Sequence, residues 1–333
     1  MAAPACSFIP LAEREAWNHA LIGLDHAFAH TWESCHAMQL TTGWPTYLYV
    51  FGSADTTFVC PIAERTYDDA IDVVTPYGFS GFVGNGSATA VLDAWHELAR
   101  ERGYVCGYIG LNPVLADAAL CREGGADAHN EVFLLELRRS EAVLFDALST
   151  NRRREISKWR RRGAPLIVDR PRLRSLFLDR YAEFMASRGA APVYGFSRAT
   201  LEELLSLDNV MLIGAGDGEE PEAVAVFAYT PAVADYLFGV SLPGGEHHSG
   251  VLVWEGVRRL QELAIPVLNL GGGVRSGDGV ADFKRRFGAA PVPLTRLRHV
   301  YDPDRFEALC RRAGADPTDW SRYFPPYRAA AGN

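Results

Sequence analysis

Residues 268–289 carry the side chains best suited to chemistry in this chain. Their sequence, LNLGGGVRSGDGVADFKRRFGA, follows an apolar strand expected at residues 266–270 and ends in a short basic helix. The glycines at 271–273 allow backbone angles that other residues rarely adopt, and Asp278 or Asp282 can cap the helix. The pattern predicts that Lys284 is held, with backbone amides nearby, at the carboxyl end of a strand. Spacing alone leaves open an ordinary turn with a solvated lysine.

A second segment that could take part in function is rich in arginine and lysine. Residues 151–162 hold seven arginines and lysines and a single acidic residue, Glu155, although the whole chain has a net charge of -8. An acidic protein with a dense basic stripe can attract a phosphate-rich partner locally. A solvated helix face is the alternative for such a run.

The bulk composition limits the class of protein. The chain has 333 residues, of which 48% are hydrophobic and 22% charged, which indicates a globular protein large enough for two domains. Its six cysteines are scattered, without a CxxC pair or a histidine at ligand spacing, so we expect neither a disulfide framework nor a metal site. The sequence shows no membrane span and no signal peptide. We therefore expect a soluble, cytoplasmic protein.

Strands and helices alternate in two successive series, which indicates an α/β (α+β) protein. The expected strands are residues 47–51, 57–61, 104–111, 131–137, 210–215, 223–229, 235–240 and 266–270. The expected helices are residues 88–102, 140–162 with a break near Ser149, 173–188, 200–207 and 250–263. The motif Tyr-Gly-Phe-Ser occurs at Tyr77 and again at Tyr194, which hints at a duplication. No low-complexity linker separates the halves, so we expect them to pack around a cleft.

The second half resembles a known acyltransferase core. Strand 235–240, a loop, helix 250–263, strand 266–270 and a helix ending in Phe-Lys-Arg-Arg-Phe-Gly follow the order of the GNAT fold. The Leu-Gly-Gly-Gly, Asp-Gly and Phe-Lys elements resemble more specifically the Fem-type aminoacyl transferases, which build peptidoglycan cross-bridges from aminoacyl-tRNA. The resemblance implies two tandem GNAT-like domains with mixed sheets flanked by helices. They would be residues 1–139, with 297–333 packing back on them, and residues 140–296, without the coiled-coil arm of some members.

The resemblance also implies roles for particular residues. Phe283 and Lys284 match the family's late Phe-Lys pair, and Asp282 beside them could be a base or a helix cap. The implied substrate-binding residues are Tyr77, Gly78, Arg188, Tyr194, Tyr236, Ser241 and Gly272. The implied tRNA-binding residues are Arg152, Arg153, Arg154, Lys158, Arg161 and Arg285, to which Arg286, Arg296 and Arg298 could add phosphate contacts.

Two acyl donors are possible for this fold, a CoA thioester and an aminoacyl-tRNA. GNAT enzymes bind the CoA pyrophosphate with an Arg/Gln-x-x-Gly-x-Gly/Ala loop, which residues 241–250 lack, and Glu246 would stand where the pyrophosphate charge must be accommodated. Residues 274–279 fit that spacing apart from the first position, but they follow the wrong strand. These departures favour aminoacyl-tRNA over CoA as the donor.

An aminoacyl ester needs no nucleophilic side chain, because it is already activated. When an amine attacks the ester, a tetrahedral oxyanion forms and requires a cation or amide donors. Lys284 would supply the cation, while Phe283 and Tyr77 would exclude water. His247 and His248 could relay a proton, although a solvated turn is the simpler interpretation.

We therefore expect an aminoacyl-tRNA-dependent transferase that forms a peptide bond on a peptide, a cell-wall precursor or an intermediate of antibiotic biosynthesis. It would be a monomer, with no metal or cofactor and with aminoacyl-tRNA as co-substrate. A CoA-dependent N-acyltransferase and an inactive GNAT-like binding module are the alternatives. The amino acid donated, the acceptor and the general base stay open.

Overall fold

The chain forms two compact units. The computed structural model describes residues 5–53, 55–123, 125–163, 165–218, 220–273, 278–321 and 323–329, without the side chain at 129. Unit 1 consists of Met1–His129 and Leu294–Asn333, and unit 2 of Asn130–Pro293. The sequence placed these divisions later, at 139 and 296, because it does not show that strands β7 (Ala126–Glu136) and β12 (Ala290–Val300) each pass from one unit into the other.

Unit 1 contains a mixed sheet in the order β1-β2-β3-β4-β6-β12, with β5 paired to β3. Strands β2 and β3 pair with each other in antiparallel direction, whereas β4 and β6 are parallel. The remaining elements of the unit are β1 (Ala5–Pro10), β2 (Thr46–Gly52), β3 (Thr57–Tyr67), β4 (Ala70–Val74), β5 (Val83–Asn85), β6 (Tyr104–Gly110), α1 (Arg14–Ala20), η1 (Phe28–His30), α2 (Trp32–Thr42), α3 (Ala88–Glu101), η2 (Leu120–Arg122), α10 (Pro303–Arg312) and α11 (Pro326–Ala329).

The core of unit 1 is built around the apolar face of α3. Val91, Leu92, Trp95 and Ala99 recur at helical spacing and are buried. The indole Nε1 of Trp95 donates a hydrogen bond to the Tyr301 hydroxyl at 2.8 Å. This bond satisfies the polar atom of a tryptophan that is otherwise enclosed by apolar side chains.

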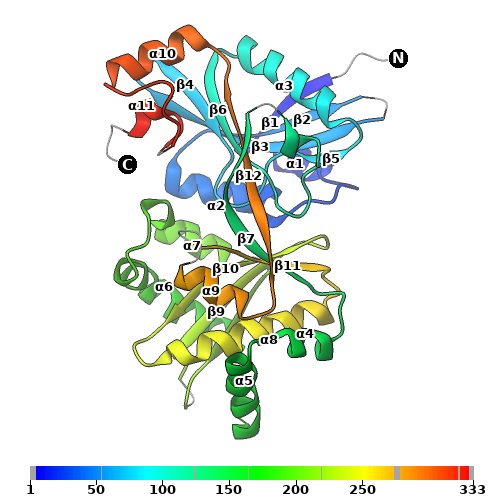
Figure 1. The fold of residues 1–333 in the computed structure, drawn as a ribbon, viewed down its shortest axis with the longest axis vertical. Helices are drawn as coiled ribbons and strands as arrows, with labels where there is room; N and C mark the ends of the chain where they lie inside the picture. Colours follow the sequence, from blue (N-terminus) through cyan, green and yellow to red (C-terminus); the bar gives the residue numbers. More distant parts are fainter. Residues whose placement is uncertain are drawn as a thin grey trace. The chain divides into compact units, whose positions relative to one another are not determined.

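Unit 2 contains a sheet in the order β7-β11-β10-β9-β8 (Figure 1). Only the β10–β11 pair among these neighbours is parallel. Helix α8 packs against β9, and α6 packs against β8 and β10. Its further elements are α4 (Glu141–Ala147), α5 (Thr150–Arg162), α6 (Arg170–Ser187), η3 (Pro192–Tyr194), α7 (Arg198–Leu204), β8 (Val210–Ala215), β9 (Ala223–Tyr229), β10 (Ala234–Ser241), η4 (Gly245–His248), α8 (Ser249–Glu262), β11 (Val267–Gly272) and α9 (Gly279–Arg285).

The helical region around Ser149 is divided as the sequence predicted. Ser149 ends the connection after α4 and caps α5, because its hydroxyl accepts a hydrogen bond from the Arg152 amide at 3.3 Å. Among the described residues no helix exceeds the 18 residues of α6, so the structure contains no coiled-coil arm there. None of the described helices has the length and apolar character that crossing a membrane requires.

Helix α8 approaches strand β9 closely at a glycine. A Cβ at Gly256 would lie 2.3–2.8 Å from the Phe227 ring on β9. We expect Gly256→Ala to lower the free energy of unfolding by about 1–3 kcal/mol, because the ring and the helix must separate. Urea unfolding measures the change. Gly279→Ala on α9, where nothing lies within 4 Å of a Cβ, is the matched control, and equal losses for both variants would contradict the prediction.

Candidate functional site

Lys284 is a buried residue of helix α9 in unit 2, and its ammonium reaches the end of β11. Helix α9 begins after Asp278, whose carboxylate accepts a hydrogen bond from the Ala281 amide at 2.8 Å, so Asp278 is the cap and Asp282 is not. Lys284 is only 8% exposed, and its Nζ donates a hydrogen bond to the Gly272 carbonyl oxygen at 2.5 Å. The solvated-lysine alternative is therefore wrong for this residue.

The surroundings of Lys284 determine its protonation state and the position of its ammonium group. Burial lowers the pKa of Lys284 to about 8, and the Asp278 carboxylate opposes that shift. The ammonium is therefore the main form at pH 7. Gly271 adopts a φ of +74°, and a Cβ there would lie 3.1 Å from the Lys284 Nζ. The glycine turn thus provides both a left-handed residue and the space that the ammonium fills.

A buried carboxyl group that the sequence did not single out is linked to the same turn. Asn269 of β11 donates from Nδ2 to Oδ1 of Asp235 on β10 at 2.9 Å. The Oδ1 of Asn269 accepts from the Gly271 amide at 2.8 Å. Burial raises the pKa of Asp235 to about 7, and the bond from Asn269 acts in the opposite direction. Asn269 therefore connects an ionisable buried group to the backbone beside Lys284.

The raised pKa of Asp235 predicts how stability depends on pH. A carboxyl with a folded-state pKa above its unfolded value holds its proton longer in the folded state, so stability falls as pH rises towards 7. Asp235→Asn has no proton to lose and can still accept from Asn269. We expect the free energy of unfolding of this variant, relative to that of the native chain, to rise by about 3 kcal/mol from pH 5 to pH 8. Urea unfolding of both proteins at the two pH values measures this. A difference that is the same at both pH values would contradict it.

Phe283 and Arg152 form one packed group. The Phe283 ring lies 5.3 Å from the Phe287 ring, and the Arg152 guanidinium lies 4.9 and 4.7 Å from the two ring centroids. Arg152 is 6% exposed, and its Nη1 lies 2.6 Å from Glu155 Oε2. Arg152 thus attaches α5 to α9. It does not share the surface of the other basic residues, contrary to its expected place in a tRNA contact.

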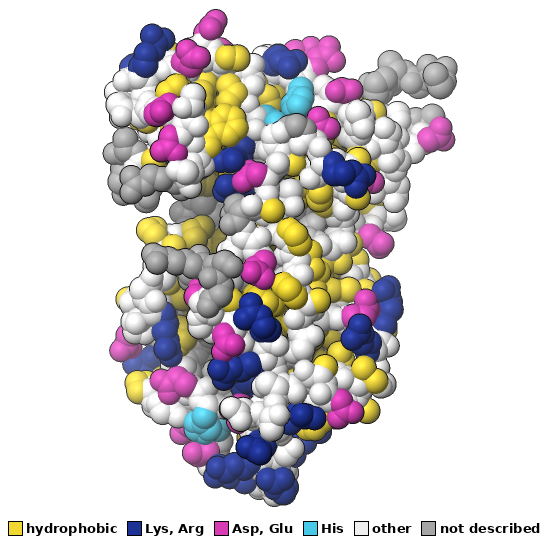
Figure 2. Space-filling model, in the orientation of Figure 1, with side chains coloured by type: hydrophobic (Ala, Val, Ile, Leu, Met, Phe, Trp, Pro, Cys, Tyr) yellow, Lys and Arg dark blue, Asp and Glu magenta, His cyan; other side chains and the backbone are white. Residues whose placement is uncertain are grey.

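Three other basic residues of α5 do form an exposed stripe. Arg154, Lys158 and Arg161 are exposed and lie at positions i, i+4 and i+7, so they share one helix face. Figure 1 shows α5 projecting from the rest of unit 2, and arginines and lysines gather over this end in Figure 2. Arg153 is half-buried, and Arg285 on α9 is exposed with its guanidinium 5.3 Å from the Phe133 ring.

The expected acceptor contacts of unit 2 lie in three segments. Arg188 follows α6, is exposed, and has its Nη2 3.9 Å from Glu246 Oε1. Tyr194 ends η3, and its carbonyl accepts from the Tyr181 hydroxyl at 2.8 Å. Tyr236 on β10 packs 5.3 Å from the Phe227 ring, and burial raises its pKa to about 12. Tyr236 and Phe283 both pack against the apolar core of unit 2, and Ser241 ends β10.

Tyr77 and Gly78 lie in unit 1, in the loop after β4. Gly78 has a φ of +120°, and a Cβ there would lie 2.7 Å from the Ala29 Cβ. Asn112 donates to the Phe79 carbonyl and fixes the same loop. The second Tyr-Gly-Phe-Ser motif instead spans the end of η3 and the Ser197 cap of α7. The two copies occupy different structural positions and do not mark a duplication.

Several other expected residues have defined partners. Asp282 lies 2.6 Å from Arg286, so its carboxylate is paired on the helix surface. Arg296 and Arg298 in unit 1 lie 3.0 and 2.9 Å from Asp127 carboxylate oxygens. The Glu246 carboxylate accepts from the Gly244 amide at 2.8 Å. Positions 274–277 of the second CoA-like loop lie outside the described residues.

The two loop histidines differ in their environment. The His247 side chain is 52% exposed and fits the expected solvated turn, whereas that of His248 is 3% exposed. The solvated-turn interpretation is therefore wrong for His248. Burial lowers the pKa of His248, and the nearby imidazole of His247 adds to the shift.

Known structures share this fold, although no protein-family model and no curated protein matches the chain. FemX is similar with a TM-score of 0.68 and 11% identity, over 91% of this chain and 99% of FemX. A conserved protein of unknown function from Bacteroides thetaiotaomicron has a TM-score of 0.61 and 14% identity, over 90% and 100%. L-PGS from Bacillus licheniformis has a TM-score of 0.54 and 12% identity, over 86% and 92%. The chain therefore has a FemX-like fold, which is built from two compact units.

Proposed function

We propose that this protein is an acyltransferase that moves an amino acid from aminoacyl-tRNA to an amine and forms a peptide bond. The observation that carries the proposal is the buried ammonium of Lys284, which is anchored on the Gly272 carbonyl at the end of β11. The FemX-like fold supports the reaction class. The acceptor would be the amine of a peptide, a cell-wall precursor or a natural-product intermediate.

The main chemical requirement of this reaction is a positive charge near the carbonyl oxygen of the ester. The acceptor nitrogen bonds to the carbonyl carbon, a tetrahedral oxyanion forms, and the ester C–O bond then breaks. The ribose oxygen of the tRNA leaves with the electron pair and takes up a proton, while the nitrogen loses one. Of the three N–H groups of the Lys284 ammonium, one is directed at Gly272. In the proposed reaction the other N–H groups would donate to the oxyanion, because a fixed cation in a low-dielectric site is most effective there.

No acyl-enzyme step is needed, and unit 2 contains no thiol that could form one. All six cysteines lie outside residues 130–293 in the sequence. Direct attack of the amine on the tRNA ester is therefore the simplest route. By this route the enzyme accelerates the reaction by orienting the amine against the ester and by stabilising the oxyanion.

The loop before α8 supports a donor other than CoA. A CoA pyrophosphate would need free backbone amides at this helix start. In this loop the Gly244 amide already donates to the Glu246 carboxylate, and Glu246 also lies 3.9 Å from Arg188. A carboxylate in that position repels an incoming phosphate. The exposed stripe of Arg154, Lys158 and Arg161 instead offers phosphate contacts suited to a tRNA.

The test is transfer from a charged tRNA pool in which each amino acid is labelled in turn, with peptide and nucleotide-linked amines as acceptors. We expect label to move to one acceptor, and ribonuclease treatment of the donor to abolish the transfer. A parallel titration with acetyl-CoA distinguishes the alternative donor. Saturable acetyl-CoA binding with ribonuclease-insensitive acyl transfer would overturn the proposal in favour of a CoA enzyme, and binding without any transfer would favour an inactive module.

A further inference from the structure

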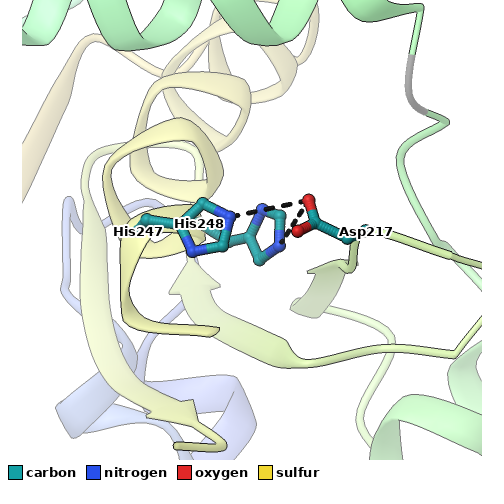
Figure 3. A group of neighbouring side chains, drawn as sticks. All are labelled: Asp217, His247 and His248. Carbon is teal, nitrogen blue, oxygen red and sulfur yellow. Dashed lines mark ion pairs between the residues drawn. The ribbon is translucent and has the colours of Figure 1, made fainter. Parts of the chain in front are cut away.

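A cluster of metal-ligand side chains lies at one end of unit 2, formed by two loops that are far apart in the sequence. Asp217 comes from the turn between β8 and β9, and His247 and His248 end η4 (Figure 3). Asp217 Oδ1 lies 3.6 Å from His247 Nε2 and 3.8 Å from His248 Nε2. Each of the three residues offers one potential metal-ligand atom, and these three atoms all lie within 4.8 Å of one another.

The spacing of these atoms suits a small divalent ion. A tetrahedral zinc with bonds of about 2.0–2.1 Å keeps its ligand atoms about 3.4 Å apart. The two nitrogen–oxygen separations are only slightly longer, at 3.6 and 3.8 Å. Asp217 and His247 are both more than half exposed, so their side chains can close the difference by small rotations. Imidazole nitrogen and carboxylate oxygen are ligands that zinc accepts.

The orientation of His247 supports a metal-binding nitrogen. Its Nδ1 lies 2.8 Å from the Gly244 carbonyl oxygen. A carbonyl can only accept, so Nδ1 carries a hydrogen. In the neutral imidazole Nε2, which is directed at Asp217, then keeps its lone pair. A backbone carbonyl on the other ring nitrogen is the usual partner of a metal-bound histidine, because it fixes both tautomer and ring orientation.

The charges around the cluster favour a cation. Glu222 adds a second carboxylate, with Oε2 3.3 Å from His248 Nε2. Among the described residues, Arg162 lies within ion-pair distance of Asp217, with its Nη1 3.9 Å from Oδ1 and both side chains more than half exposed. Such an exposed pair is weak, so Arg162 offsets only part of the negative charge of Asp217 and Glu222. A divalent ion would neutralise both carboxylates.

We propose that Asp217, His247 and His248 bind one zinc ion, with a water molecule as the fourth ligand and Glu222 accepting a hydrogen bond from that water. The ion would tie the β8–β9 turn to η4, the segment that leads into α8. This site is independent of the transfer reaction at Lys284. It would act as a structural clamp on unit 2.

The test uses the full chain, stripped with EDTA and titrated with zinc chloride by calorimetry. We expect one zinc per chain, a raised midpoint of thermal unfolding, and at least about a 10-fold loss of affinity in Asp217→Asn and in His247→Ala, because even changes behind the ligands weaken zinc sites by that much. Glu220→Gln on the same turn and His19→Ala on α1 are matched controls that should bind like the native chain. Circular dichroism confirms that each variant folds.

Cobalt(II) identifies the ligands independently. Nitrogen and oxygen ligands in a four-coordinate site give visible d–d bands without the intense thiolate-to-cobalt charge transfer, so binding at the exposed Cys6 or Cys121 would be recognised. The proposal is overturned if the native chain shows no stoichiometric zinc binding, if the two ligand variants bind as tightly as the controls, or if the cobalt spectrum shows thiolate ligation.

Discussion

Lys284→Met is expected to reduce the rate of aminoacyl transfer by about 10²–10³-fold, the range found when a single donor to an oxyanion is removed. Methionine keeps an unbranched stem of similar volume and removes the charge. The loss should fall on kcat and leave the KM for aminoacyl-tRNA nearly unchanged, because the ammonium acts on charge that develops only in the transition state. Single-turnover transfer with a saturating charged tRNA measures the effect.

Stability separates a catalytic role of Lys284 from a structural one. Lys284 is 8% exposed and is charged at pH 7, so replacing it with methionine removes a buried charge and should not lower the free energy of unfolding. Lys284→Arg keeps a cation and should retain more activity than Lys284→Met. Turnover close to that of the native chain in Lys284→Met, with the fold intact, would refute the proposed role of the ammonium.

The pH dependence of the same reaction gives a second measurement on Lys284. Its pKa is lowered to about 8, so the cation is present below that pH and is lost as pH rises through it. Transfer by the native chain should therefore decline above about pH 8, once the ammonium deprotonates. In Lys284→Arg that decline should move to higher pH, because a guanidinium stays protonated. The same decline in both proteins would assign it to another group.

The sequence was most informative where a local pattern determines the structure. The strand, glycines, cap and Phe283-Lys284 pair occur within twenty-two residues, and the structure places Lys284 at the end of β11 as predicted. Ser149 could be recognised as a helix start because its capping bond involves only its own neighbours. By contrast, β12 was not predicted, because Pro291 and Pro293 lower the expectation of a strand and its partner β6 is far away in the chain.

The site was least predictable where function depends on burial or on distant contacts. Arg152 belongs to a basic run, and only its i, i+4 relation to the buried Ile156 indicates that it faces inward. Asp235 stands beside the recognised Tyr236, yet its raised pKa follows from burial, which one sequence does not reveal. Asp217 lies thirty residues before His247, so no ligand-spacing motif could associate them.

The second large effect concerns the exposed stripe of α5. We expect the combined variant Arg154→Gln, Lys158→Gln and Arg161→Gln to weaken tRNA binding on the order of 10²-fold at 0.1 M salt, because three phosphate contacts and their released counterions are lost. The plot of log affinity against log salt should become shallower by about 2 to 3 units. Filter binding or fluorescence anisotropy over a salt series measures both quantities.

A matched control tests whether the stripe acts through its position or only through the net charge of the protein. Arg180 and Arg198 are also exposed residues of unit 2 and Arg172 is half-buried, and each is within ion-pair distance of a carboxylate of its own. Converting these three to glutamine changes the net charge by the same amount. It should alter tRNA affinity by no more than about threefold, since long-range charge effects are screened at this salt.

The two triple variants therefore remove the same charge but are expected to differ in their affinity for tRNA. Selective loss in the α5 variant, with kcat at saturating tRNA preserved, would place the donor contact on this helix face and separate donor binding from the chemistry at Lys284. Equal losses in both variants would mean that α5 contributes only to the general field of the protein. The donor's phosphates would then have to contact other residues, among which Arg285 on α9 is the nearest in sequence to Lys284.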